Sequence, residues 1–548
     1  MSAGRQLKRS LLASSMLVLC AGYGRAQQVL ISNDETRILS DNVTTYGVPA
    51  VAAYGDGGGV SAIDLTTSGT ITSDFAGVVF RPRYGATDTV SQNTITNTGS
   101  ISANVGGIVL YAGYANGEPA VISDNVITNS GVITAGGAGV LLMASNHDAD
   151  QVSDVAGNTV ENVGSINAAS SGFGAIALLA ISDGSATITD NLIVNSGEIT
   201  TAYNGVIVFA QSTVHALTTD NVIDNSGQIN MIGDSGGQYG ITVGATSMDS
   251  AASVSANTIT NSGEIVSTAN NFAVGIMLAS SGQTAELIGN NVVNSGTIDV
   301  SGLGILVLAQ ALASPCRAED ANEAKVCRSA TDDAGYSALI AANHIENTGD
   351  ITTGSTGSAG IHLLAIGNDQ SVISGNEVSN SGVISTGGDS SYGIGLEAQS
   401  SSKGGAGSAI VSHNVISNSG SITTSGNGST GIAAYSVSLG SSYESIPYNL
   451  GAVTGNQILN SGSITTSGTN AFGILAGAFS DETASVSGNT IVNSGSIATA
   501  GDQGAGVLVY AWGDSESIVG GNAIYSSGEI HTAGLSSHGV WVLSLIHI

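Results

Sequence analysis

The sequence is poor in the residues that build long helices and many catalytic sites. Only 9% of its 548 residues are charged, 4% are aromatic, and five are proline. Long helices need Leu, Glu, Lys and Ala repeating at 3.6-residue spacing, and no sustained run of that kind occurs. Val, Ile and Thr placed between Asn and the 77 glycines instead indicate short strands and many turns.

Basic residues are also scarce, because 11 Lys and Arg stand against 41 Asp and Glu, a formal charge of −30. Four of the basic residues lie in the first 26 positions, which contain no acid, so the rest of the chain carries 7 − 41 = −34. A surface of this charge repels nucleic acid and anionic membranes. We therefore expect no nucleic-acid partner, and a surface suited to solubility outside the cell or to binding cations.

Residues 1–26 have the pattern of a secretory signal peptide. Basic residues within positions 5–9 precede an apolar segment at 11–21, which is too short to span a bilayer. A small-x-small sequence then ends at Ala26, so we expect cleavage between Ala26 and Gln27.

One phrase, N-x-[IV]-x-N-[ST]-G-x-[IV], recurs along nearly the whole chain, and most copies are 32 or 33 residues apart. A second phrase, G-[IV]-x-[LV]-x-[AS], follows each copy after seven to ten residues. Each repeat therefore offers three short apolar strands separated by Asn, Ser and Gly, as in residues 186–210. The glycines of the first phrase are Gly99, Gly131, Gly164, Gly197, Gly227, Gly263, Gly296, Gly349, Gly382, Gly420, Gly462, Gly495 and Gly528.

A single repeat cannot bury its apolar residues, but stacked repeats can. Each strand would pair in parallel with its copy one repeat away, the Ile residues would form interior rows, and the Asn residues would form ladders of side-chain amides. The glycine that opens the second phrase permits a sharp corner. Because crossovers between parallel strands are strongly right-handed, we predict an all-β fold: a right-handed parallel β-helix of about fourteen ~33-residue repeats.

The repeats also define the expected domain organisation. Residues 27–60 fit the repeat poorly and are interpreted as an N-terminal cap, whereas 61–548 form the β-helix. Two intervals are longer than the rest, and their extra residues, 311–338 and 436–450, are expected to be surface loops that carry binding. The chain ends in the middle of a repeat strand, which indicates a truncated reading frame.

The loop at 311–338 contains two of the three cysteines, Cys316 and Cys327. Exported proteins meet an oxidising environment, and these two residues are eleven positions apart, so they are candidates for a local disulfide. Two free thiols in a loop are the alternative.

No motif predicts a catalytic, cofactor-binding or metal-binding site, because HExxH, CxxC, P-loop and G-x-S-x-G phrases are all absent. His362 lies in a repeat strand, where a solvated or packed histidine is a simpler interpretation than a ligand. Asp124, Asp190 and Asp220 each precede the first Asn of the phrase, and stacking would bring Asp190 and Asp220 together. Weak Ca²⁺ binding is one interpretation of this corner and simple solvation is the other. We expect no cofactor.

Carbohydrate chemistry is the alternative that the sequence leaves open. Some β-helix proteins are polysaccharide lyases or hydrolases, which need convergent carboxylates and usually a basic residue. The repeats contain almost no basic residues, which argues against a lyase but leaves an all-carboxylate hydrolase open. Tyr111, Tyr203, Tyr435 and Tyr510 lie near second-phrase strands and are candidates for stacking on sugars, although scattered tyrosines are ordinary on a β surface.

The signal peptide, followed by glycine-rich N-S-G-x-I and G-I-x-L repeats with very few Cys and Lys, resembles the passenger domain of bacterial autotransporters and related β-helical adhesins. The resemblance covers roughly residues 60–544 and rests on repeat style. A close cysteine pair in a loop also fits that family. Its members end in a β-barrel translocator, which is missing here, in line with a truncated reading frame.

The resemblance implies an exported protein at the cell surface or outer membrane of a Gram-negative bacterium, or secreted from it. It also implies adhesion to a host or bacterial surface receptor or glycan, or self-association, through an acidic β-helix without enzymatic activity. A carbohydrate-active β-helix enzyme is the alternative function, and a purely structural spacer is the third.

Overall fold

The computed structural model of the chain describes residues 28–55, 59–83, 88–113, 118–169, 173–233, 237–268, 272–311, 335–402, 407–440 and 449–546. All regular secondary structure in these ranges is β-strand, so they contain no helix that could cross a membrane. The expected cleavage site at Ala26 and Gln27 and the candidate disulfide Cys316–Cys327 lie outside these residues.

Most turns of the fold consist of four strands rather than the three expected from the sequence. In a representative turn these are β20 (Gly174–Ser182), β21 (Ser185–Thr189), β22 (Leu192–Asn195) and β23 (Glu198–Thr201). The extra strand arises at Asp190, whose φ of 56° places it in the left-handed region between β21 and β22. Such a residue ends one strand and redirects the chain into the next, so a single apolar run is divided in two.

The strands stack in parallel, turn upon turn. β20 pairs with β24 (Asn204–Ser212), β21 with β25 (His215–Thr219), and the remaining strands of the turn follow the same rule. The described strands form a parallel β-solenoid of about 13 turns with a spacing of ~33 residues, which confirms the predicted fold class. Its right-handedness remains a prediction from the crossover rule.

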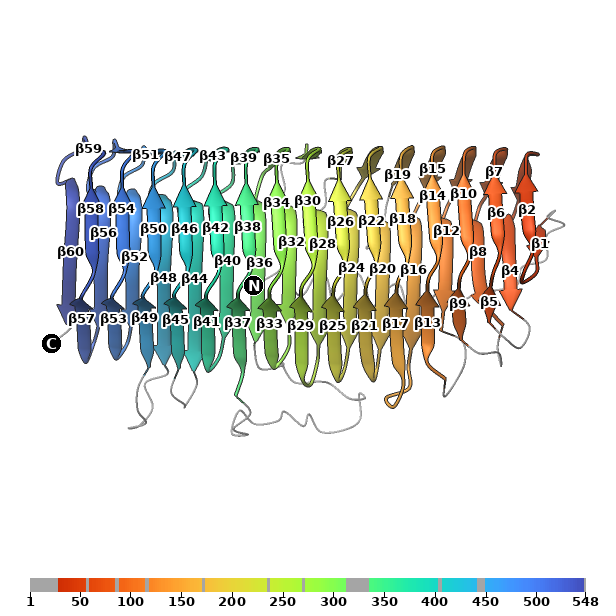
Figure 1. Ribbon diagram of the computed structural model, residues 1–548, viewed down its shortest axis with the longest axis horizontal. Helices are drawn as coiled ribbons and strands as arrows, with labels where there is room; N and C mark the ends of the chain where they lie inside the picture. The colour runs from red at the N-terminus through yellow and green to blue at the C-terminus, as the bar shows by residue number, and fades with distance from the viewer. Residues whose placement is uncertain are drawn as a thin grey trace. The chain divides into compact units, whose positions relative to one another are not determined.

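The solenoid divides into two compact units. The first contains the chain up to Ala245 with Ala256–Met277 and Gly296–Ser301, and the second contains Thr246–Ser255, Leu278–Ser295 and the chain from Gly302. Within each unit the copies of one strand lie side by side (Figure 1). The long strand of each turn, such as β20, is nine residues in most turns, and the other three strands have four or five.

The segment interpreted as a cap contributes strands to the same ladders. β2 (Thr36–Leu39) pairs with β6 (Asp64–Thr67), and β3 (Val43–Thr45) pairs with β7 (Thr70–Ser73). Leu30, Ile38 and Tyr46 are more than half exposed in this segment.

The interior consists of rows of aliphatic side chains that repeat once per turn. Ile193, Ile199 and Val206, from three strands of the repeat, are at most 1% exposed. The glycine near the start of most long strands makes room for this interior. At Gly360 a Cβ atom would overlap Cγ2 of Ile384 in the same turn and lie 2.7 Å from the carbonyl oxygen of Gly393 in the next turn, so the absence of a side chain leaves room for both.

The two asparagines of the first phrase form the predicted amide ladders. Asn158 donates from Nδ2 to Oδ1 of Asn191 at 3.0 Å, and Asn162 donates to Asn195 at 2.7 Å. Both ladders continue through the turns of each unit and are almost completely buried. Because a buried amide without a partner is costly, these ladders explain the repeated asparagines as structural residues.

Candidate functional site

The outward face of the long strands in the second unit gathers most of that unit's aromatic side chains. These strands are β40 (Ala359–Gly367), β44 (Tyr392–Ser402), β48 (Thr430–Gly440), β52 (Phe472–Ser480) and β56 (Ala505–Gly513), and they pair in register in that order. Successive residues of a strand point to opposite faces, so His362, Glu397, Tyr435 and Tyr510 face outward while their neighbours fill the interior. Tyr392 and Phe472 lie at the strand starts and pack against an outward cluster that includes Leu475. We call the following outward residues the aromatic surface: His362, Tyr392, Glu397, Tyr435, Phe472 and Tyr510.

Large and small residues alternate from turn to turn on this surface. In one register row Tyr435 and Tyr510 flank Gly477. A Cβ at Gly477 would lie 2.6 Å from Cε1 of Tyr510 and 3.1 Å from Cδ2 of Tyr435, so both rings lean over the glycine. The ring centroids are 6.3 Å apart with an interplanar angle of 38°. The two rings therefore lie close together above the sheet.

A histidine and a carboxylate lie at the edge of the aromatic surface. Nε2 of His362 is 3.4 Å from Oε2 of Glu397, and the two side chains are only 10% and 15% exposed. The distance between these two atoms is within the range of an ion pair, but Nε2 of His362 makes no hydrogen bond of normal geometry. Gln399 donates from Nε2 to Oε1 of Glu397 at 2.6 Å. The His362 ring also packs against Tyr392, with centroids 5.5 Å apart.

The electrostatics of this cluster favour an ionised acid and neutral phenols. Burial alone would raise the pKa of Glu397, but His362 and the Gln399 amide outweigh it and bring the pKa below its ordinary value. Burial raises the pKa of Tyr392, Tyr435 and Tyr510, and the Glu397 carboxylate adds to the rise for Tyr392 and Tyr435. The surface therefore presents one carboxylate acceptor among hydroxyl groups that stay protonated at neutral pH.

Replacing Glu397 with an uncharged residue should make the free energy of unfolding depend less on pH in the acidic range. Because the folded pKa of Glu397 is lowered, the ionised group stabilises the fold above its unfolded pKa, near 4.5, and this stabilisation is lost as pH falls through the folded pKa. We expect Glu397→Gln to cost about 1–2 kcal/mol at pH 7 and progressively less as the pH falls below the ordinary carboxyl range. Urea denaturation across this pH range measures the difference.

The matched control is Glu377→Gln, which changes a His–Glu pair on the solvent side. Nδ1 of His344 is 3.5 Å from Glu377, but the side chains are 40% and 62% exposed. Exposed pairs contribute little, so this variant should stay within about 0.5 kcal/mol of the original protein. A Glu397→Gln penalty that persists unchanged at low pH would contradict the electrostatic explanation.

The structure brings together three residues that the sequence identified separately: His362, Tyr435 and Tyr510. His362 is packed rather than solvated. Tyr392 and Glu397 were not predicted, although aligning the second phrase places Glu397 in the same register row as Tyr435 and Tyr510.

Two other candidate tyrosines belong to the first unit. Tyr111 lies on the outward side of β12 (Gly106–Ala112), beside the apolar cluster of Val79 and Val109. Tyr203 lies in the connection between β23 and β24. Neither residue belongs to the aromatic surface of the second unit.

The three candidate aspartates have a conformational explanation. Asp124, Asp190 and Asp220 all have φ of 56°, and Asp190 and Asp220 occupy equivalent positions in neighbouring turns. Aspartate tolerates the left-handed region better than most residues because its short polar side chain bonds locally. Across the described ranges, no group of three or more His, Cys, Asp or Glu side chains has metal-binding geometry.

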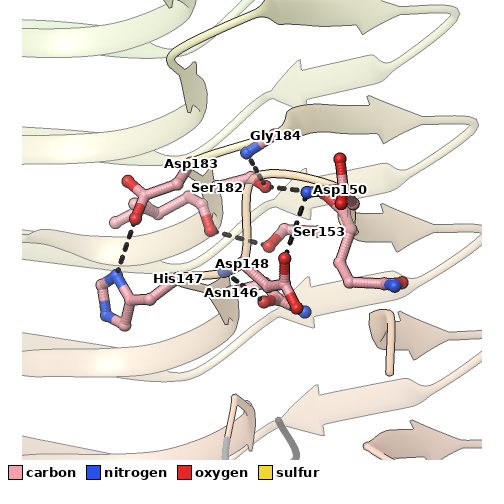
Figure 2. Close-up of polar contacts among 10 residues, drawn as sticks. Asn146, His147, Asp148, Asp150, Ser153, Ser182, Asp183 and Gly184 are labelled. Carbon is pink, nitrogen blue, oxygen red and sulfur yellow. Dashed lines mark hydrogen bonds and ion pairs between the residues drawn. The ribbon is translucent and has the colours of Figure 1, made fainter. Parts of the chain in front are cut away.

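A polar corner of the first unit lies where the long strands end. Figure 2 shows this corner, in which the labelled residues of two neighbouring turns are Asn146, His147, Asp148, Asp150, Ser153, Ser182, Asp183 and Gly184. Ser153 donates to the carbonyl of Ile181 at 2.6 Å, and Ser182 donates to the carbonyl of Gln151 at 3.0 Å. The His147–Asp183 pair is 3.8 Å apart and more than half exposed, so it contributes little energy. These contacts fix the shape of the loops, and the acids do not converge on one point.

Comparison with known proteins gives no match to a protein family, to a curated protein or to a solved structure. The parallel β-solenoid agrees with the architecture of a β-helical passenger, which the sequence style resembles.

Proposed function

We propose that the protein is an exported passenger β-helix that acts by binding, either to a surface receptor or glycan or to further copies of itself. Its location in this proposal is the cell surface, the outer membrane or the medium of a Gram-negative bacterium. The signal-peptide pattern of residues 1–26 and the parallel β-solenoid support export and the passenger architecture. The acidic composition supports a soluble, nucleic-acid-free surface.

The observation that carries the proposal is the contrast between the two sides of the long strands in the second unit. The inward residues of these strands, such as Ile394 and Leu396, are buried in interior rows, so the fold itself accounts for them. The outward aromatic surface, in contrast, has partly exposed large side chains that the interior does not need. Exposed aromatic residues in a cluster are typical of binding surfaces.

This surface gives the hydrolase alternative no support. Hydrolysis of a glycosidic bond usually needs two carboxylates a few ångströms apart, one on each side of the bond. Glu397 is the one carboxylate among the described residues of β40, β44, β48, β52 and β56. The pair of acids required for that chemistry is therefore lacking on this face.

Export and binding are tested separately. For export, the full chain and a variant lacking residues 1–26 are produced in a Gram-negative host, and the fractions are examined by mass spectrometry. We expect the full chain outside the cytoplasm with Gln27 as its first residue, and the shortened chain inside. Retention of the full chain in the cytoplasm, unprocessed, would contradict the proposal.

For binding, beads coated with the purified full chain are compared with beads coated with an unrelated protein of similar acidity. We expect the coated beads to attach to epithelial or bacterial cells or to cluster with one another, whereas the control beads stay dispersed. If both kinds of bead behave alike, the protein is not an adhesin, and the spacer function gains support.

A further inference from the structure

We propose that the aromatic surface binds an uncharged glycan, with a sugar ring stacked on Tyr435 and Tyr510 and a sugar hydroxyl donating to Glu397. The inference rests on the proposed binding function and names the ligand class and the residues for it. It assigns His362 and Gln399 the task of positioning Glu397 rather than touching the sugar.

The floor of the site is the pair of tyrosine rings above Gly477. Because residue 477 has no side chain, the rings approach the backbone from both neighbouring turns, to within 2.6 Å and 3.1 Å of the point that a Cβ atom would occupy. The ring centroids are 6.3 Å apart, and both tyrosines are partly exposed on this face. A ring of a pyranose has an apolar face of C–H groups, which stacks on such a floor and removes apolar area from water.

The carboxylate supplies the polar contact that a sugar needs. Glu397 is adjacent to Tyr435 in the register row, one turn away. Its Oε1 accepts from Gln399, and its Oε2 has His362 beside it, so the carboxylate is held in place from two sides. An ionised carboxylate offers about four acceptor positions, so others remain for hydroxyl donors. The hydroxyls of Tyr435 and Tyr510 hydrogen-bond to each other, which leaves the pair one phenol O–H as a donor to the sugar.

Charge restricts the glycan to an uncharged one. The described residues of the second unit include no Lys or Arg, and the whole chain carries a net charge of −30. A uronate or a sulfated sugar would therefore meet repulsion from Glu397, and the described residues of this unit offer no Lys or Arg to compensate for it. Neutral hexoses and N-acetylhexosamines avoid this penalty.

The arrangement fits a sugar better than a quaternary ammonium ion. Ammonium cages place several aromatic faces around a common centre, so that each face points at the cation. Here the rings of Tyr435 and Tyr510 meet as a pair over Gly477, and the nearest carboxylate already lies beside His362.

The test measures the binding of soluble hexasaccharides to the purified full chain by saturation-transfer NMR and by calorimetry. The probes are cellohexaose, maltohexaose, mannohexaose and chitohexaose, with hexagalacturonate as the charged comparison and choline as the cationic one. We expect at least one neutral hexasaccharide to bind, and Tyr435→Ala and Tyr510→Ala each to weaken it about tenfold or more. Glu397→Gln should weaken it by a smaller factor.

The control variant is Tyr525→Ala, which removes a tyrosine that is 61% exposed on β58 (Ala523–Ser526) in another sheet. It should bind the sugar like the original protein, and circular dichroism confirms that all variants fold. The inference is wrong if no neutral hexasaccharide binds, if the tyrosine variants bind unchanged, or if choline or hexagalacturonate binds more tightly. Beads that attach to cells while the purified chain binds no sugar would overturn this inference alone, whereas sugar binding without bead attachment would overturn the adhesin function.

Discussion

Replacing Asn191 with alanine is expected to destabilise the protein by about 3–5 kcal/mol, one of the largest effects of a single substitution. The Asn191 side chain takes part in five hydrogen bonds. Its Oδ1 accepts from the backbone and Nδ2 of Asn158, and its Nδ2 donates to the carbonyls of Val155 and Thr189 and to Asn221. Alanine leaves the buried donors of Asn158 and the carbonyl of Val155 without these partners, which is costly inside the fold.

The matched control is Asn230→Ala, also in the first unit. Asn230 is on β27 (Gln228–Met231), is partly exposed and makes one weak side-chain contact with Glu198 at 3.4 Å. We expect a change within about 0.5 kcal/mol. The measurement is urea denaturation combined with hydrogen exchange, because solenoids can open locally before they unfold as a whole. A loss below about 1 kcal/mol for Asn191→Ala would mean that the ladder is dispensable.

The sequence predicts the solenoid because its signals repeat. Residues equivalent to Ile199 and the asparagines recur in each repeat at nearly constant spacing. A residue type that recurs at the same position of every repeat fills the same structural role in every turn. The interior rows and amide ladders are therefore read directly from the phrase N-x-I-x-N-S-G-x-I.

The fourth strand of each turn could not be predicted in this way. The position that divides the apolar run is occupied by Asp190, Gly157, Ala256 or His413, which share a positive φ but no side-chain chemistry. The left-handed backbone is imposed there by the stacked turns above and below. Residue type alone does not reveal it, since alanine and histidine at positive φ are unusual.

The candidate site was only partly predictable for a related reason. Tyr435 and Tyr510 belong to repeats separated by another turn, and only the register shows that they meet above Gly477. Glu397 lies in a strand whose sequence pattern is similar to that of the neighbouring long strands. Its significance comes from His362 in the preceding turn, which faces the same way at a distance of 3.4 Å between side-chain atoms.

Replacing Gly382 with alanine is expected to destabilise the second unit by about 3–5 kcal/mol, or to prevent folding of the turns around it. Gly382 belongs to the N-S-G corner, where successive turns approach each other through their backbones. A Cβ there would overlap the carbonyl oxygen of Gly349 and lie 2.7 Å from the carbonyl carbon of Thr348. Both obstacles are backbone atoms fixed by the stacking, so neither can move aside without breaking the ladder.

The same substitution seven residues earlier is the control. Gly375 has a φ of 64°, but no atom lies within 4 Å of its Cβ position. The equivalent residue one turn earlier is Ala342, with a φ of 53°, so the corner accepts a methyl group. Gly375→Ala should cost about 1–2 kcal/mol, the strain of a left-handed alanine. If chemical denaturation shows equal losses for both variants, close stacking is not what selects glycine at the N-S-G corner.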